Sequence, residues 1–104
     1  SSAVTATTDY FFLLSEYEVF GSITYANTYE ANKQAQYDYY KAGNSKMKYK
    51  YNASGTSGTQ VFWWLRSPDR ASVNRFTGVG TSTNGNAARN NAGLSFAFAP
   101  GFCV

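Results

Sequence analysis

The chain has 104 residues and a mass of 11.4 kDa, enough for one small domain with a single modest hydrophobic core. Only 14% of the residues are charged, and the net charge of +3 is too weak and scattered to predict a nucleic-acid partner. The sequence has no histidine and one cysteine. These counts exclude the usual Ser–His and Cys–His nucleophile pairs and the common zinc sites. We therefore expect no catalytic residues, no metal site, no cofactor and no enzymatic activity.

The beginning of the chain differs in composition from the remainder. Residues 1–8 are small and rich in hydroxyl groups, without periodicity, so we interpret them as a linker or domain edge and residues 9–104 as the domain. A linker here predicts that the domain is part of a longer chain. No apolar run is long enough to span a bilayer, so we expect no membrane insertion.

The first apolar stretch predicts a strand followed by a short helix. Residues 10–14 form a short apolar run of the kind found in buried strands. Ser15 and Glu18 match a capping box at the start of a helix, and Gly21 suits its end. Glu16 and Glu18 are also a conceivable pair of catalytic carboxylates, but helix capping is the simpler interpretation.

Two further elements are predicted before the centre of the chain. Residues 29–41 contain good helix formers and are followed by Ala42-Gly43-Asn44, which predicts a second short helix. Residues 46–51 alternate strictly between lysine and Met or Tyr, which is the pattern of a half-exposed strand. The lysine side is open to two interpretations, an anionic partner or protection of a sheet edge, and we favour the second.

Both tryptophans of the chain lie in the apolar run 61–68, which ends at a Ser-Pro pair. We interpret Trp63 and Trp64 as part of a buried central strand, and a sugar-stacking platform is the alternative. The segment that follows is polar and rich in glycine and asparagine. A rigid strand leading into such a segment is a common way to hold a binding surface on a scaffold.

The last third of the chain is small, polar and turn-forming until its apolar end. Phe76 and Val79 are expected to anchor a short strand, and Asn84-Gly85 is a typical hairpin dipeptide. Residues 97–104 predict a final apolar strand that docks in the sheet. Within it, we interpret Cys103 as a small apolar side chain rather than a reactive thiol. As the only cysteine, it can form no internal disulfide.

Four sequence blocks occur in one order and carry a resemblance to a known group of domains. They are FLLSEYEVFG at 12–21, YKAGNSK at 40–46, WWLRSP at 63–68 and APGFCV at 99–104. Together they resemble a domain of gut bacteria and their phages that is related to the C-type lectin-like fold of the formylglycine-generating-enzyme type. The resemblance implies an α+β fold, in which a twisted antiparallel sheet carries two short helices and a long irregular loop region.

Members with an asparagine-rich segment between the last two blocks resemble the variable proteins of diversity-generating retroelements. In such systems a reverse transcriptase copies a template with errors at adenines, and the copy replaces the 3′ end of the target gene. The resemblance therefore implies a scaffold with a changing binding surface. It also implies a phage virion or bacterial cell surface as the location, and a protein or glycan on a cell surface as the ligand.

The composition of the chain allows a test of this idea. An AAC asparagine codon that changes only at its adenines never yields Lys, Glu, Gln, Met or Trp. Residues 1–68 contain fourteen of these residues and residues 69–104 contain none. At the density of the first part, about seven would be expected in the second. An ordinary polar loop does not predict this depletion, because loops readily accept lysine and glutamate.

Eleven positions are candidates for the variable ligand-binding surface, since related sequences tend to have asparagine there and each residue is reachable from AAC. They are Asp69, Arg70, Arg75, Thr77, Thr81, Ala88, Arg89, Gly93, Leu94, Phe96 and Phe98. Phe96 and Phe98 are alternatively core strand residues. Arginine and aromatic side chains dominate many interfaces, and we expect the segment 69–98 to present one surface whose binding is independent of calcium. The alternative function is a fixed adhesin that attaches to glycan or cell wall.

Overall fold

The structure is a computed structural model, and it describes residues 11–51, 53–55, 58–81, 85–94, 96–98 and 100–102. These residues form a small α+β domain, as expected from the sequence. In chain order the elements are β1 (Phe11–Leu13), α1 (Glu16–Phe20), the 3-10 helix η1 (Thr28–Asn32), α2 (Asp38–Lys41), β2 (Lys48–Tyr51), β3 (Gly58–Val61), β4 (Trp63–Pro68), β5 (Arg75–Val79), β6 (Ala87–Asn91), β7 (Ala97–Phe98) and β8 (Pro100–Phe102).

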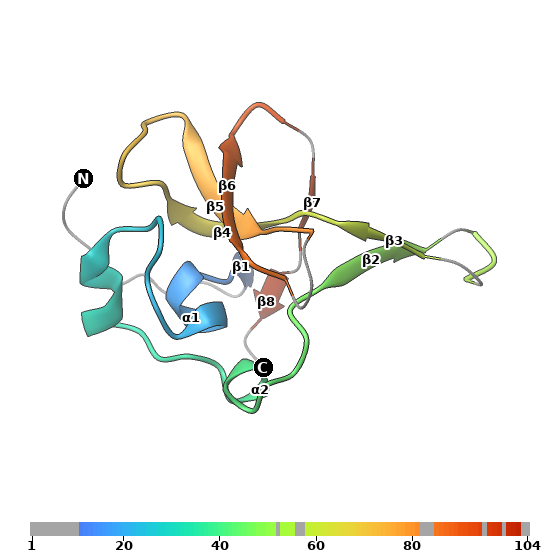
Figure 1. Cartoon of the computed structure of the whole chain (residues 1–104), viewed down its shortest axis with the longest axis horizontal. Coiled ribbons are helices and arrows are strands. Elements are labelled where there is room, and N and C mark those ends of the chain that lie inside the picture. Colours follow the sequence, from blue (N-terminus) through green and yellow to red (C-terminus); the bar gives the residue numbers. More distant parts are fainter. Residues whose placement is uncertain are drawn as a thin grey trace.

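The described strands form one four-stranded sheet and two antiparallel pairs. The central sheet has the order β6-β5-β4-β7, in which β4 pairs with β7 in parallel and the other neighbours are antiparallel. The sheet is therefore mixed rather than purely antiparallel as expected. The strands β2 and β3 form a ribbon that projects from the body, and β1 pairs with β8 (Figure 1).

The strand β4 carries the hydrophobic core, as predicted for the tryptophan run. Trp63 and Leu65 are buried on the face that packs on Val19 of α1. The indole N–H of Trp63 donates a hydrogen bond to the carbonyl oxygen of Lys46 at 2.9 Å, so its polar atom is satisfied inside the core. Trp64 points to the opposite face, because side chains alternate along a strand, and it is only partly buried.

The helix α1 begins and ends as its sequence predicts. The hydroxyl of Ser15 accepts from the backbone N–H of Glu18, and the Glu18 carboxylate accepts from the backbone N–H of Ser15. Gly21 follows the helix with a φ of 68°, in the left-handed region that glycine adopts without strain. These capping groups end a helix of five residues.

The prediction of one helix over residues 29–41 is wrong. The segment instead forms η1 and α2, separated by an irregular stretch that is tied to α1. The backbone N–H of Tyr37 donates to the carbonyl oxygen of Glu18 at 2.9 Å, and the Gln36 amide donates to the carbonyl oxygen of Val19 at 3.0 Å. These tertiary hydrogen bonds override a helix propensity that is worth only a fraction of a kcal/mol per residue, roughly 0 to 0.7.

The β2–β3 ribbon differs from the half-exposed strand predicted at residues 46–51. Tyr49 and Tyr51 should lie on its buried face, yet their exposed fractions are 44% and 60%. The ribbon lies beside the sheet rather than within it, so neither of its faces is covered along its length (Figure 1). Alternation of lysine and tyrosine predicted the strand correctly but not its degree of burial.

The apolar end of the chain docks in two places. Residues 97–98 extend the central sheet and residues 100–102 pair with β1, so the predicted single strand is split between two sheets. Cys103 lies outside the described residues, as do residues 1–8, and the predictions for both stay predictions. The strand predicted around Phe76 and Val79 is confirmed by β5.

Candidate binding groove

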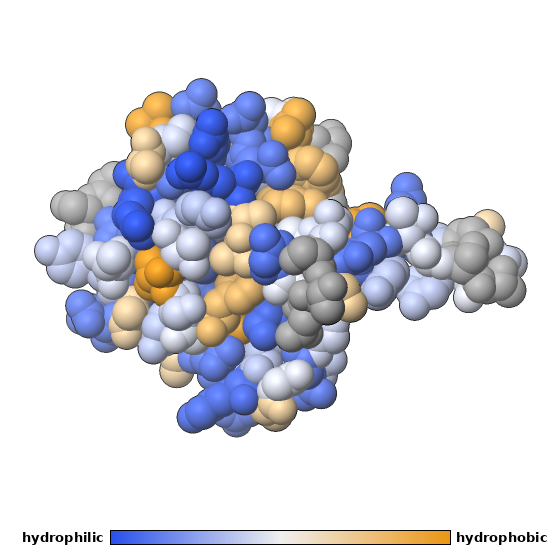
Figure 2. Space-filling model, viewed as in Figure 1, coloured by the Kyte–Doolittle hydropathy of each residue, from blue (hydrophilic) through white to orange (hydrophobic). Residues whose placement is uncertain are grey.

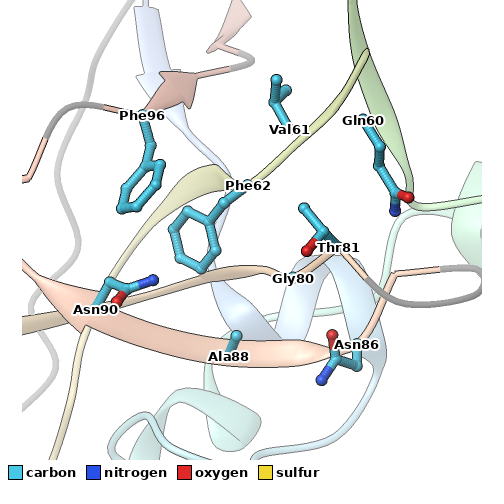
Figure 3. A pocket seen from close by; sticks show the side chains of 9 residues that line it. All are labelled: Gln60, Val61, Phe62, Gly80, Thr81, Asn86, Ala88, Asn90 and Phe96. Atoms are coloured by element: carbon cyan, nitrogen blue, oxygen red, sulfur yellow. The ribbon is translucent and has the colours of Figure 1, made fainter.

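An open groove of about 650 Å³ lies where the β2–β3 ribbon joins the central sheet. This volume is within the range of ligand pockets, about 300–1,000 Å³. Figure 2 shows apolar residues gathered beside β7, next to the base of the ribbon. Figure 3 shows the side chains that line the groove, which are Gln60, Val61, Phe62, Gly80, Thr81, Asn86, Ala88, Asn90 and Phe96.

The floor and one wall of the groove are aromatic. The ring centroids of Phe62 and Phe96 lie 4.7 Å apart, and Trp64 contacts both rings at 5.2 and 5.5 Å. Phe62 is only 7% exposed, whereas Phe96 is 39% exposed. Phe62 therefore forms part of the floor, and Phe96 presents a ring at the rim. Contacts of this kind add about 0.5–1.5 kcal/mol per pair beyond the burial of area.

The opposite wall is polar and comes from β6 and the residues before it. Ala88 and Asn90 are two residues apart on β6, so both side chains face the groove (Figure 3). Asn86 lies two residues before Ala88 and also lines the groove. The Asn86 side chain packs over Gly80, where a Cβ would lie 2.3 Å from its Oδ1 atom. Neither asparagine side chain makes a hydrogen bond to another described residue. Their amides are therefore available to a ligand.

A second cluster of predicted residues lies on the other face of the β5–β6 pair. Arg89 pairs with Thr77 across the two strands, so it faces away from Ala88 and the groove. Its guanidinium lies 4.9 Å from the Tyr25 ring centroid and 3.0 Å from an Asp69 carboxylate oxygen. The Arg70 guanidinium donates to the carbonyl oxygen of Ala26 at 3.0 Å.

Arg75 lies two residues before Thr77 on β5 and therefore on the same face as Arg89. Arg70, Arg75 and Arg89, which we call the arginine edge, are all exposed. Arg70 and Arg89 contact the adjacent residues Ala26 and Tyr25, and Arg75 lies on the same strand face as Arg89. Arg70 and Arg89 are held by contacts to residues 25–26 and Asp69. The arginine edge is thus a second exposed patch, separated from the groove by the sheet.

The eleven predicted positions do not form one continuous surface. Thr81, Ala88 and Phe96 line the groove, and Arg70, Arg75 and Arg89 form the arginine edge. Gly93 and Leu94 lie in an exposed turn after β6, and Phe98 belongs to β7, although its side chain is not described.

Two of the predicted positions do not reach solvent. Asp69 is 5% exposed and Thr77 is fully buried, so the expectation that the whole set faces a ligand is wrong for these two. Asp69 accepts from the backbone N–H of Ala71 and from Arg89. The Thr77 hydroxyl donates to the carbonyl oxygen of Ser67 at 2.8 Å. Both side chains therefore support the scaffold beneath the surface.

Sequence reasoning missed much of the groove lining. Gln60, Val61 and Phe62 precede the polar segment, and only their position beside the tryptophans marks them. Asn86 and Asn90 are not among the eleven predicted positions, because an asparagine that still matches the template codon carries no sign of change. The spacing of two between Asn86, Ala88 and Asn90, directly after a hairpin dipeptide, is the signal that predicts one strand face.

The two glutamates weighed as a catalytic pair have structural roles. Glu18 caps α1 and forms an ion pair with Arg66 at 2.6 Å. Glu16 is fully buried, and its carboxylate accepts hydrogen bonds from the backbone N–H groups of Thr24, Tyr25 and Ala26. Glu16 thus fixes the segment that supports the arginine edge.

A third acidic residue, Glu30 of η1, is also buried. Its Oε2 atom accepts a hydrogen bond from the Ser67 hydroxyl at 2.8 Å. Burial raises the pKa of the Glu30 carboxyl above its usual value, although the hydrogen bond from Ser67 acts in the opposite direction. Glu30 lies in the core beneath β4 rather than in the groove.

Within the described part of the chain, no three acidic, cysteine or histidine side chains are grouped so that they could hold a metal ion. The helices that the structure describes are all too short or too polar to cross a membrane.

The described residues thus form a small α+β domain whose groove is lined by aromatic rings, amides and a hydroxyl group. The match to the family described as Domain of unknown function (DUF6273) covers residues 1–104, and the chain belongs to that family. Among curated proteins and among solved structures, no match to this chain was found.

Proposed function

We propose that this domain binds a ligand through exposed residues of the segment 69–98, and that retroelement mutagenesis diversifies these residues. One observation carries the proposal, namely how the groove is divided along the sequence. Its floor residues Gln60, Val61 and Phe62 lie before residue 69. Its rim residues lie within residues 69–104, the part of the chain that lacks Lys, Glu, Gln, Met and Trp. The rim residues are Thr81, Asn86, Ala88, Asn90 and Phe96. Each of them is reachable from an AAC codon by changes at adenines.

The packing supports a separation of scaffold and surface. Five of the six buried residues of the core cluster, among them Val19, Trp63 and Leu65, come from the first 68 residues, and the sixth is Val79 of β5. Substitutions at exposed rim positions such as Thr81 and Phe96 leave that core in place, and surface substitutions usually change stability by no more than about 0.5 kcal/mol. A rim can therefore vary while the fold stays.

The resemblance supplies the remaining parts of the proposal. A C-type lectin-like scaffold is compatible with an α+β domain that carries two short helices, although the strands β5 and β6 occupy much of the region expected to be one long irregular loop. The ligand would be a protein or glycan on a cell surface, and the domain would be displayed by a phage virion or a bacterial cell. Binding at the arginine edge as well as in the groove would give two recognition patches, one on each face of the β5–β6 pair. Arginine and aromatic anchors of this kind dominate paratope-like surfaces.

The DNA next to the coding sequence tests the proposal. We expect a near-copy of the last codons, differing at adenines and lying close to a reverse transcriptase gene. A fixed adhesin for glycan or cell wall is the second candidate, since a groove of aromatic rings and amides serves such a ligand without diversification. If the surrounding DNA holds neither a near-copy nor a reverse transcriptase gene, the fixed adhesin replaces our proposal.

A further inference from the structure

The groove combines aromatic, amide and hydroxyl groups and carries no charge. None of its nine lining residues is acidic or basic. An anionic ligand would leave its water shell without gaining a counter-charge, and an isolated charge in such a site is costly. A purely apolar ligand would bury the amides of Asn86 and Asn90 without hydrogen-bond partners, which is unfavourable. The lining therefore fits an uncharged ligand with both apolar and hydroxyl-bearing surfaces.

We propose that the groove binds an uncharged pyranose ring of a glycan. A pyranose has a face of C–H groups that packs on an aromatic ring, and hydroxyl groups around its edge. Phe96 presents a ring at the rim that is 39% exposed, backed by Phe62 and Trp64. The amides of Asn86 and Asn90 each offer donors and an acceptor, which matches hydroxyls that both donate and accept.

This inference rests on the proposed function, because it divides the recognition between constant and variable residues. Phe62 and Gln60 precede the diversified segment, so every variant of the domain keeps an aromatic floor with an amide beside it. The rim positions, including Asn90 and Phe96, decide which sugar is held. The floor thus sets the ligand class, and the rim selects the member of that class.

A glycan array probed with the intact 104-residue domain tests the ligand class. The array should hold neutral oligosaccharides beside sialylated and sulfated ones, and we expect binding to neutral members only. The best-bound neutral oligosaccharide is then titrated against the domain and followed by NMR shifts of the Asn86 and Asn90 amides. Movement of these amides supports the groove as the site. Binding to charged glycans alone, or to no glycan, overturns the proposal.

Rim variants test whether the groove is responsible. Phe96→Ala should weaken binding at least tenfold and Asn90→Ala severalfold, because stacking and one hydrogen-bonding amide are lost. Tyr29→Ala removes a comparably exposed aromatic side chain on η1, far along the chain from the groove residues, and should leave the dissociation constant unchanged. Phe62→Leu keeps apolar volume under the groove but removes the ring, and should also weaken binding in a domain whose melting curve shows it folded.

The two proposals fail in different ways. If a neutral glycan binds and Phe96→Ala has no effect, the groove is not the site and this inference is wrong. If a cell-surface protein is the ligand and Phe96→Ala abolishes its binding, the proposed glycan ligand is wrong. The proposal that the rim residues bind a ligand then still holds. If the glycan binds in the groove but no near-copy exists in the DNA, the ligand class stands and diversification does not.

Discussion

Gly78 lies directly beneath the ring of Phe62 on the groove face of the central sheet. A Cβ at position 78 would lie 2.1 Å from the Cζ atom of Phe62 and 2.8 Å from the carbonyl oxygen of Trp63. The second contact is to backbone of the adjacent strand, so it cannot be relieved by turning a side chain. The floor of the groove therefore depends on a glycine that lies inside the segment proposed to vary.

The first prediction concerns this glycine. Gly78→Ala should lower the free energy of unfolding by about 1–3 kcal/mol, the usual cost of overpacking a filled interior. Urea unfolding followed by tryptophan fluorescence measures the change. Gly93→Ala is the matched control, since a Cβ at position 93 meets nothing within 4 Å. Equal stability of the two variants would show that Phe62 is not packed on Gly78.

The second prediction concerns the buried carboxylate of Glu16. Glu16→Gln replaces one of the two oxygens that accept from the backbone of residues 24–26 with an N–H₂ group. Hydrogen bonds to charged groups contribute about 1.5–3 kcal/mol, so we expect a loss of unfolding free energy of roughly that size. Faster amide hydrogen exchange at Thr24 and Tyr25 should accompany it. Asp38→Asn, at an exposed site, should have little effect on either quantity, and protection unchanged in Glu16→Gln would refute the role assigned to Glu16.

The third prediction concerns pH. Burial raises the pKa of Glu30 in the folded state above its unfolded value. Between these two values the folded protein binds the proton and the unfolded chain does not, so stability falls as pH rises through this window. The contribution of Glu30 is fully present below the unfolded pKa and is lost above the folded one. Glu30→Gln removes this dependence.

Thermal unfolding from pH 4 to pH 8 tests the sign of the effect. The difference in melting temperature, Glu30→Gln minus wild type, should grow more positive with rising pH through the window. The Ser67 hydroxyl can still donate to the amide oxygen of the variant, so its packing is retained. A difference that stays constant, or that shrinks with rising pH, contradicts a raised pKa at Glu30.

The fourth prediction concerns calcium. The motifs of acidic and asparagine residues that bind calcium in sugar-binding lectins are missing from the sequence, so we expect ligand binding to be independent of calcium. Isothermal titration of the domain with calcium should show no stoichiometric heat. A saturable site with one ion per chain would refute this prediction.

Local signals in the sequence predicted the scaffold well. The capping box at Ser15 and Glu18, the stop at Gly21 and the buried strand at Trp63 each depend on neighbouring residues, and each is found in the structure. The failures concern elements whose form depends on distant partners. Residues 29–41 break into two short helices because Tyr37 and Gln36 bond to α1, which the local sequence does not encode.

The candidate site was predicted only in part, for a geometric reason. Composition marks a segment, but the two faces of a strand alternate, so the segment 69–98 supplies both solvent and core positions. Phe76 and Thr77 are neighbours on β5, yet Phe76 is exposed and Thr77 is buried. The groove also depends on the pairing of β4 with β5 and on the contact between Phe96 and Phe62. Both are tertiary contacts that the local sequence does not encode.

Exposed positions of the segment 69–98 should be rewritten while buried ones are kept. Deep sequencing of this segment across a population of the gene tests it codon by codon. We predict variation at the rim codons, including Ala88 and Phe96, by changes at template adenines, with Gly78 and Val79 invariant. Rim codons as constant as those of Gly78 and Val79, or variation that affects buried and exposed codons alike, would rule out the proposed diversification.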